Sequence, residues 1–135
     1  QKLISFIDRI VRQNCIFSCR DFRDFDVFAL TSQDFVYADP PYLITCATYN
    51  ERGGWSETDE KDLLSFLDEL NGRNIRFALS NVLRSKGREN NILVDWLDKN
   101  ADKYKIIQLN FSYSNSNYQT KDKTSASEEV LIINY

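Results

Sequence analysis

The chain has 135 residues, of which 42% are hydrophobic and 27% are charged. This length and balance fit one globular domain with a core of its own. The absence of histidine excludes the Ser-His and Cys-His nucleophile classes, and a net charge of −3 argues against nucleic-acid binding through the overall electrostatic field.

The cysteine count and the short apolar runs bear on location and metal binding. Three cysteines, an odd number, disfavour a secreted disulfide framework and favour a reducing, cytoplasmic location. Cys15 and Cys19 lack the further ligands that a zinc site needs, so we expect no metal site. The apolar runs span only a few residues, which predicts neither a signal peptide nor a membrane partner.

The first segment predicts an amphipathic helix. Its apolar residues recur at helical spacing, as Leu3, Ile4, Ile7, Ile10 and Val11. The chain contains no methionine, and Gln1 already falls inside this helical pattern. We therefore interpret the sequence as a piece of a longer protein, with a removed initiator methionine as the alternative.

The remainder alternates expected strands and helices. Strands are predicted at 15–18, 35–38, 75–79, 106–111 and 130–133, and helices after Ser56 and around 92–97. Ser56 and Asp59 are typical of a capping box, and Gly72 is expected to close the helix that they begin. This alternation predicts an α/β fold with an open, mostly parallel sheet.

Polar residues follow three of these expected strands. Ligands bind beyond the carboxyl ends of strands in open α/β sheets, and Asp21, Asp39 and Asn81 fall at such ends. Each has a structural alternative, since Asp21 could cap a turn with Phe22 packed behind it, and Asn81 could bond its own backbone. Both tryptophans are interpreted as packing residues rather than as base-stacking ones.

The most informative motif is Asp39-Pro40-Pro41-Tyr42, which directly follows the apolar run 35–38. Each proline fixes its own φ at about −65°, and Pro40 pushes Asp39 out of the helical region. The Asp39 carboxylate, the Pro40 carbonyl and the Tyr42 ring are therefore held in one rigid turn that lacks two backbone donors. Such a turn suits a ligand with hydrogens to donate, such as an aromatic amine. A rigid loop entry is the alternative for the two prolines alone.

The ordered motifs resemble those of the adenine-specific DNA methyltransferases, in particular the Dam-like, GATC-type methylases of restriction-modification systems. The catalytic motif of that family is similar to 35–42, and it is followed here by Trp55-Ser56-Glu57, the run 77–82, Tyr113 and the terminal run 128–135. The resemblance covers nearly the whole chain. It implies a Rossmann-like fold that depends on S-adenosylmethionine, of which this chain holds an incomplete, carboxyl-terminal part.

The resemblance also implies catalytic roles for the motif, including Pro41 as one of its members. The Asp39 carboxylate and the Pro40 carbonyl would accept the hydrogens of the exocyclic amine of an adenine flipped out of double-stranded DNA, with Tyr42 stacked on its ring. The methyl group would pass in line from S-adenosylmethionine, without a covalent enzyme intermediate. The aspartate at position 39 favours adenine over the two alternative targets, the amine of cytosine and a protein glutamine.

On the same basis, Asp21 and Phe22 border the adenine of the cofactor, and Asp39 lies near its methionine end. The glycine loop and the basic motif that complete this pocket in the family are absent. The resemblance divides the chain into 1–14, the helical tail of a target-recognition region, and 15–135, the carboxyl-terminal part of the catalytic domain. We expect the chain alone to be inactive and to need a missing amino-terminal half or a homodimer partner. A non-catalytic remnant or partner subunit is the alternative.

DNA contacts are expected from local basic and polar groups, because the net charge offers no general attraction. The expected contacts are Asn81, Arg84, Lys86, Arg88, Tyr113, Lys121 and Lys123. The segment 112–127 is rich in hydroxyls, amides and lysines, which suit phosphate contacts. A solvated hairpin loop is the alternative for that segment.

Overall fold

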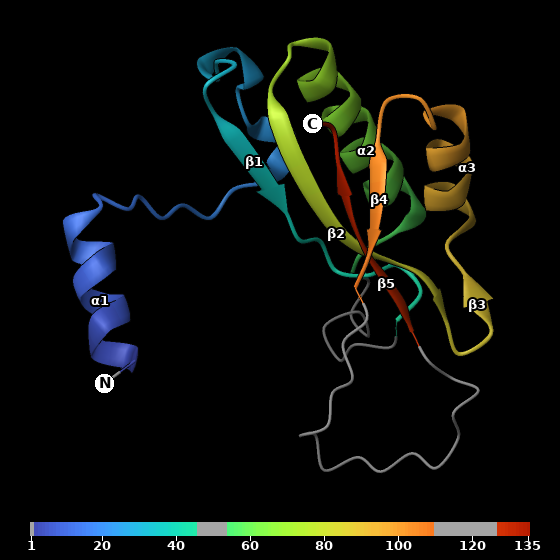
Figure 1. Ribbon diagram of the computed structural model, residues 1–135, viewed down its shortest axis with the longest axis horizontal. Helices are drawn as coiled ribbons and strands as arrows, with labels where there is room; N and C mark the ends of the chain where they lie inside the picture. Colours follow the sequence, from blue (N-terminus) through green and yellow to red (C-terminus); the bar gives the residue numbers. More distant parts are fainter. Residues whose placement is uncertain (1, 46–53, 110–126) are drawn as a thin grey trace.

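The computed structural model describes residues 2–45, 54–109 and 127–135, and Figure 1 shows their arrangement. The expected DNA contacts Tyr113, Lys121 and Lys123 lie outside these described residues. The elements in chain order are α1 (Lys2–Arg12), the short 3-10 helices η1 (Phe22–Asp24) and η2 (Val27–Ala29), β1 (Phe35–Ala38), α2 (Glu57–Gly72), β2 (Arg76–Ser85), β3 (Arg88–Glu89), α3 (Asn91–Lys99), β4 (Lys105–Gln108) and β5 (Glu128–Ile133).

The strands form one mixed sheet in the order β1-β2-β5-β4, with β3 paired to the end of β2. β1 and β2 are parallel, whereas β5 is antiparallel to both β2 and β4. It follows that β4 runs in the same direction as β1 and β2, and that β5 is a reversed strand between them. The predicted α/β fold is confirmed, but the sheet is mixed rather than mostly parallel, since β1–β2 is the one parallel pairing among the described strands.

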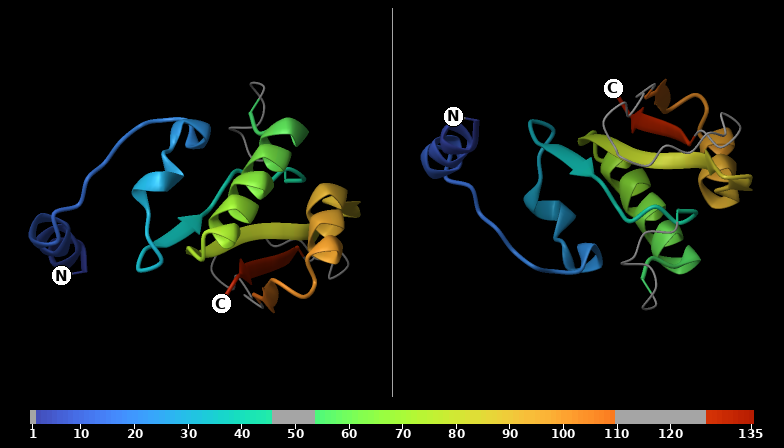
Figure 2. Two further views of the ribbon diagram at one scale, coloured as in Figure 1. Left: turned by 90° about the horizontal axis from the view of Figure 1, so that it is seen from above. Right: turned by 90° about the horizontal axis from the view of Figure 1, so that it is seen from below.

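Two helices cover one face of this sheet. α2 and α3 lie on the same side of β2 (Figure 2), and their apolar faces pack against Phe77, Leu79, Val130 and Ile132, all of which are fully buried. Because side chains alternate across a strand, these four residues belong to one face of β2 and β5. The core therefore lies between the sheet and the two helices.

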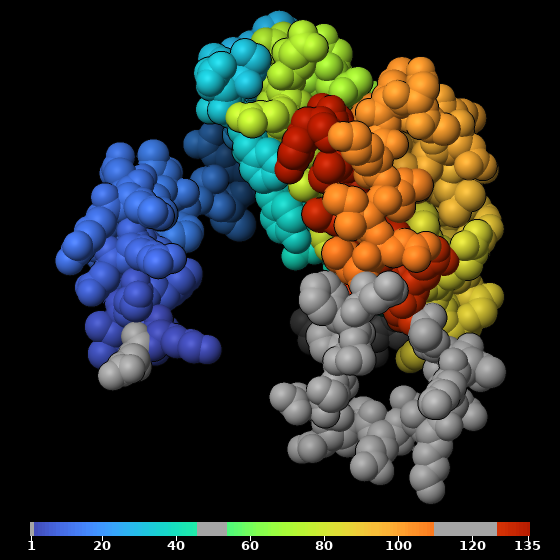
Figure 3. Space-filling view, in the orientation of Figure 1, coloured from blue at the N-terminus to red at the C-terminus, as the bar shows by residue number. Residues whose placement is uncertain are grey.

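The edge strand β1 is open on the face opposite to the helices, whereas the centre of that face is buried at Ala78, Ser80 and Val82. Phe35 and Tyr37 point away from α2 and are 50% and 57% exposed, and within the described residues β1 pairs only with β2. Strands β1, β5 and β4 reach the molecular surface in Figure 3. This is the uncovered edge and apolar surface expected of a sheet that lacks neighbouring strands.

The predicted start of α2 is confirmed in its details. The Ser56 hydroxyl accepts from the Asp59 backbone N–H, and the Asp59 carboxylate accepts from the Ser56 backbone N–H, so the predicted capping box is present. At the other end Gly72 is the last helical residue rather than the terminator. The chain leaves the helix through Asn74, which takes the left-handed φ of 57°.

One predicted strand is absent, and two others end at a different residue than expected, one of them at Gln108 rather than at 111. The segment 15–18 belongs to no strand, and its Ile16 and Phe17 are 88% and 78% exposed, because no described strand lies beside it to accept its backbone hydrogen bonds. β2 does not stop at Ser80 and Asn81 but continues to Ser85. Its later residues keep pairing with β5 and β3, which extends the strand beyond the expected end.

The predicted first helix is confirmed as α1, but it has no buried residues. It lies apart from the sheet, joined to it by an extended segment (Figure 1). Among the described residues, no helix combines the length and apolar character needed to cross a membrane.

Candidate active site

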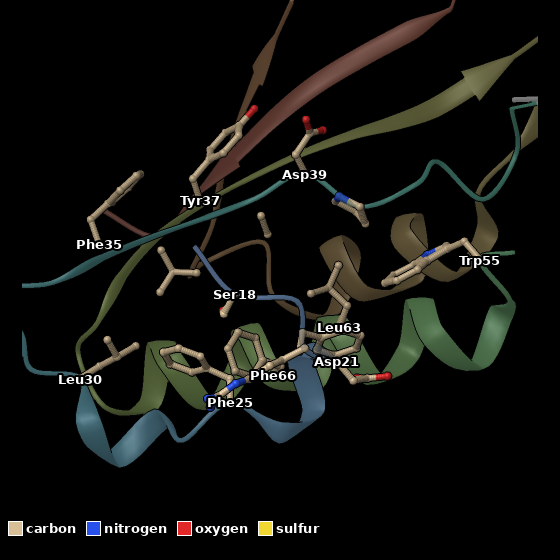
Figure 4. A pocket seen from close by; sticks show the side chains of 15 residues that line it. Ser18, Asp21, Phe25, Leu30, Phe35, Tyr37, Asp39, Trp55, Leu63 and Phe66 are labelled. Carbon is tan, nitrogen blue, oxygen red and sulfur yellow. The ribbon is translucent and has the colours of Figure 1, made fainter. Parts of the chain in front are cut away.

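β1 delivers the Asp39-Pro40 turn to the open edge of the sheet. Val36 and Ala38 pack toward the core, so the alternating neighbours Tyr37 and Asp39 project from the other face. Figure 4 shows Tyr37 and Asp39 directed away from α2. Asp39 is exposed and Pro40 is half-buried, which leaves the carboxylate accessible to a ligand.

A pocket of about 620 Å³ runs along this edge, within the size range of ligand sites. It brings together the two sets of residues that the sequence assigned to cofactor and catalysis, Asp21 with Phe22 and Asp39 with Pro40. Aromatic side chains supply much of the remaining wall, among them Phe25, Phe35, Tyr37, Trp55 and Phe66. The pocket is therefore largely apolar, with two carboxylates at its margin.

Tyr42 lies beside this pocket and is anchored by its hydroxyl group. The hydroxyl lies 3.1 Å from Ser80 Oγ and donates to Asp39 Oδ1 at 3.5 Å. Burial raises the pKa of the Tyr42 hydroxyl, the Ser80 hydrogen bond lowers it, and the nearby Asp39 charge raises it further. The net shift is upward, so the group stays protonated at neutral pH and can donate to Asp39. The backbone turns directly afterwards, where the Thr45 N–H and hydroxyl both donate to the Tyr42 carbonyl.

Asp21 is held in place by Arg23. Asp21 caps η1 by accepting from the Arg23 backbone N–H at 2.9 Å, and its carboxylate also accepts from the Arg23 guanidinium at 3.1 and 3.2 Å. The same guanidinium donates to Asp59 and Asp62 on α2, at 2.5 and 2.7 Å. These hydrogen bonds raise the pKa of Arg23. Hydrogen bonds from Ser56 first and Arg23 second lower the pKa of Asp59 to about 2. We refer to Arg23 with these three aspartates as the Arg23 clamp.

Phe22 lies in an aromatic cluster behind the clamp. Its ring centroid is 5.9 Å from that of Trp55 and 6.1 Å from that of Phe66, and the Arg23 guanidinium lies 4.7 Å from its ring centroid. The prediction that Phe22 packs and the prediction that it borders a ligand are therefore compatible, because the packed ring also lines the pocket.

Asn81 does not lie at a strand end. It is fully buried within β2, where its side-chain oxygen accepts from the Val82 backbone N–H and its amide donates to Glu60. This local backbone bond is the structural alternative that the sequence left open. The expected DNA contact would require Asn81 to leave these hydrogen bonds.

The expected basic residues lie on the hairpin between β2 and β3. Arg84 is committed to ion pairs with Glu89 and Glu128, at 2.5 and 2.9 Å. Lys86 occupies the hairpin turn with Gly87, at φ of 50° and 76°, and Arg88 begins β3. In the part of the chain that the structure describes, no group of three or more His, Cys, Asp or Glu side chains could hold a metal ion.

Sequence reasoning missed Arg23 and Glu60, two charged residues that organise the site. The partners of Arg23 on α2 are 36 and 39 residues away, and those of Glu60 include Asn81 and Asn90 at 21 and 30 residues. No short motif signals such contacts. For Glu60 the only local signal is a carboxylate on the apolar face of a helix.

A comparison with protein families decides the family of this chain. The model of the D12 class N6 adenine-specific DNA methyltransferases matches residues 1–122. The chain belongs to this family. An adenine-specific DNA methyltransferase is what the motif and the pocket predict, and the resemblance drawn from the sequence is confirmed at this level.

Two individual methylases align with almost the whole chain, and a third aligns with less than half of it. Type II methyltransferase M.FokI of Planomicrobium okeanokoites is 45% identical over 139 residues, which cover 100% of this chain and 21% of the relative. Modification methylase StsI of Streptococcus sanguinis is 44% identical, covering 98% of this chain and 20% of the relative. Modification methylase LlaI of Lactococcus lactis subsp. lactis is 48% identical over 65 residues, 45% of this chain. The chain thus spans about a fifth of the length of the first two relatives.

Proposed function

We propose that this chain carries the catalytic turn and one wall of the cofactor pocket of a modification methylase that methylates the exocyclic amine of adenine in double-stranded DNA. The observation that supports this most directly is the pocket that joins Asp21 and Phe22 to Asp39 and Pro40. These residues come from segments 18 positions apart along the chain, and the resemblance assigns them to adjoining parts of one site. Family membership and the names of the relatives support a role in a restriction-modification system.

The catalytic task falls to the exposed turn after β1. The lone pair of adenine's exocyclic nitrogen is delocalised into the ring, which makes the amine a poor nucleophile. The Asp39 carboxylate and the Pro40 carbonyl, held by the two prolines, would accept both amine hydrogens and leave the lone pair available. The Tyr42 ring, fixed through Ser80, would stack on the flipped base and offset part of the cost of unstacking it.

The pocket residues fit S-adenosylmethionine in their chemistry. This cofactor supplies an activated methyl group on a sulfonium centre. Phe22 and Trp55 offer apolar, aromatic surface for its purine, and Asp21 and Asp39 offer acceptors for its polar and cationic groups. The Arg23 clamp keeps Asp21 and Phe22 against α2, so this half of the pocket is formed before any ligand binds.

We propose that the other half of the pocket comes from a missing amino-terminal half or from a homodimer partner. The open β1 edge, the exposed rings of Phe35 and Tyr37 and the greater length of the relatives support this. In this proposal residues 1–14 are the tail of a target-recognition region, and residues 15–135 are the carboxyl-terminal part of the catalytic domain. The chain alone would be inactive.

Contacts to DNA would come from Lys86 and Arg88 in the hairpin, together with Tyr113, Lys121 and Lys123. The hairpin joins the carboxyl end of β2 to β3. Because β1 and β2 are parallel, Asp39, which follows β1, lies at the same end of the sheet as this hairpin. Arg84 would support the hairpin through its ion pairs rather than reach phosphate.

A methylation-sensitive digest tests the proposal. The chain is assayed alone and as a hybrid methylase, in which residues 1–135 replace the aligned segment of M.FokI. We expect adenine methylation by the hybrid and none by the chain alone, together with S-adenosylmethionine binding by the isolated chain that is weaker than micromolar. A folded hybrid that binds DNA without methylating it would support a non-catalytic remnant. Methylation of cytosine amines or of protein, and not of adenine, would show that the substrate is a different amine.

A further inference from the structure

Trp55 forms one end of the pocket, and a buried carboxylate fixes its indole. In Figure 4 the Trp55 ring lies at the end of the pocket away from Leu30 and Phe35. Its indole N–H donates to Glu60 Oε2 at 2.6 Å. The Phe22 ring is 5.9 Å away and tilted by 43°, too close for another ring to enter between them. The two rings therefore make one continuous aromatic wall.

The cap of α2 sets this arrangement. Ser56 is the N-cap, so Trp55 occupies the position before the cap and Glu60 the fourth position of the helix. These two positions commonly carry an apolar pair that staples the chain to the helix start. Here a hydrogen bond replaces that apolar contact, and the helix start itself directs the indole toward the pocket.

Glu60 has no exposed surface. Its other oxygen, Oε1, accepts from Asn81 Nδ2 at 3.0 Å and from Asn90 Nδ2 at 2.8 Å. Asn81 belongs to β2, and Asn90 caps α3 by accepting from the Leu93 backbone N–H. All three of these described neighbours are donors, so both carboxylate oxygens have a hydrogen-bond partner. The pocket wall is thereby tied to the middle of the sheet and to the start of α3.

We propose that Glu60 is a positioning residue, which holds Trp55 as an aromatic wall for the purine of S-adenosylmethionine. This inference rests on the proposed function. Among the described residues Glu60 has no cationic partner, and a buried carboxylate without one is costly to stability compared with an apolar pair. The three donors fix the orientation of the Glu60 carboxylate, which in turn fixes the indole of Trp55. An apolar side chain at position 60 would make no hydrogen bond to the indole and would leave it free to rotate.

The variant Glu60→Gln separates positioning from packing. Glutamine has the same shape, and its amide oxygen can still accept from both asparagines. Its amide N–H groups would then face the indole N–H of Trp55, donor against donor. The substitution thus breaks the Trp55 contact selectively and leaves the links to Asn81 and Asn90 in place. Asp68→Asn is the matched control, because Asp68 also lies on α2 and accepts from an aromatic side chain that Trp96→Phe leaves in place, the Tyr104 hydroxyl at 2.6 Å.

The first measurement uses the 135-residue chain and needs no ligand. In a Trp96→Phe background, Trp55 is the only tryptophan left. We expect Glu60→Gln to shift its emission to longer wavelength and to increase quenching by acrylamide, with unchanged far-UV circular dichroism. The Asp68→Asn control should leave the emission of Trp55 unchanged. Unaltered Trp55 emission in the Glu60→Gln chain overturns the inference, whether or not the chain functions as a methylase.

The second measurement uses the hybrid methylase and S-adenosylmethionine. We expect Glu60→Gln to raise the dissociation constant about tenfold, as when part of an aromatic stacking contact is lost, with a smaller change in kcat. In a Trp55→Phe background Glu60→Gln should have little further effect, because the donor that it opposes is gone. An unchanged dissociation constant, or equal losses in both backgrounds, overturns the inference. A wild-type hybrid that binds no cofactor contradicts the proposed function instead, and the fluorescence result still stands.

Discussion

The hydroxyl groups of Tyr42 and Ser80 lie 3.1 Å apart, although the two residues are 38 positions apart in the chain. Ser80 projects from β2 on the face opposite to the helices, because it alternates with the core residues Phe77 and Leu79. The contact therefore joins the turn after β1 to the neighbouring strand. It fixes the tyrosine ring from its far end while the prolines fix its backbone.

Substitution at position 42 should separate stacking from anchoring. We expect Tyr42→Ala to reduce methylation by the hybrid by roughly ten- to a hundredfold, the size of a lost base-stacking contact. Tyr42→Phe keeps the ring and should keep most of the activity. Its free energy of unfolding should be lower by about 1 kcal/mol, because the hydrogen bond of the hydroxyl is lost. Methylation rates and urea unfolding measure the two effects. Full turnover by the alanine variant would remove Tyr42 from the mechanism.

Ser80→Ala should act at a distance from the ligand. It removes the shorter of the two hydrogen bonds of the Tyr42 hydroxyl described above without touching the ring, so the turn should become more mobile and the chain less stable by about 1 kcal/mol. Hydrogen exchange at the Thr45 amide, which donates to the Tyr42 carbonyl, reports the mobility. Exchange at the rate of the wild-type chain would mean that the prolines alone hold the turn.

The Arg23 clamp predicts a difference between arginine and lysine. Arg23→Lys keeps the charge but not the planar fork that reaches three aspartates. We expect faster amide exchange at Asp24 and Phe25, the residues that η1 orders, and a lower melting temperature. Arg76→Ala, which loses one long hydrogen bond to the Gln33 carbonyl, is the control. Equal exchange in wild-type and Arg23→Lys chains would show that η1 does not depend on the clamp.

Acid should weaken the α2 cap in a defined pH window. The folded pKa of Asp59 is about 2, below its ordinary value of 3.8, so between these values the unfolded chain binds more protons than the folded one. The stabilisation by Asp59 is complete above its unfolded pKa and is lost as the pH falls toward 2. Urea unfolding from pH 6 to pH 2 should therefore show wild type and Asp59→Asn converging at low pH. A stability difference that stays constant over this range would contradict the assignment.

Lys86 and Arg88 should contribute to DNA affinity rather than to folding. In the hybrid, alanine at either position should weaken DNA binding and reduce the salt dependence by about one released counterion. Lys105→Ala is the control, since Lys105 begins β4 at the opposite end of the sheet. Affinity and salt slopes equal to those of the wild type would place the DNA elsewhere.

The sequence was sufficient where the deciding contacts are local. The Ser56–Asp59 capping box and the apolar stripe of α3 each depend on residues within a few positions, and both are confirmed. The apolar run at 15–18 failed as a strand prediction because a strand also needs a neighbour. The sequence did not predict the Arg23 clamp or the hydrogen bonds of Glu60 to Asn81 and Asn90, because these residues are far apart in the chain and meet only in the folded protein.

The central proposal is that the Asp39 carboxylate, together with the Pro40 carbonyl, accepts the hydrogens of the adenine amine and so activates it. The most direct measurement is methyl transfer to DNA adenine by the hybrid methylase with Asp39 and with Asp39→Ala. We expect the alanine variant to bind DNA normally and to lose activity by about two to three orders of magnitude, the range measured when one preorganised polar group is removed from an active site. Methyl transfer at the wild-type rate by a folded Asp39→Ala hybrid would contradict the account.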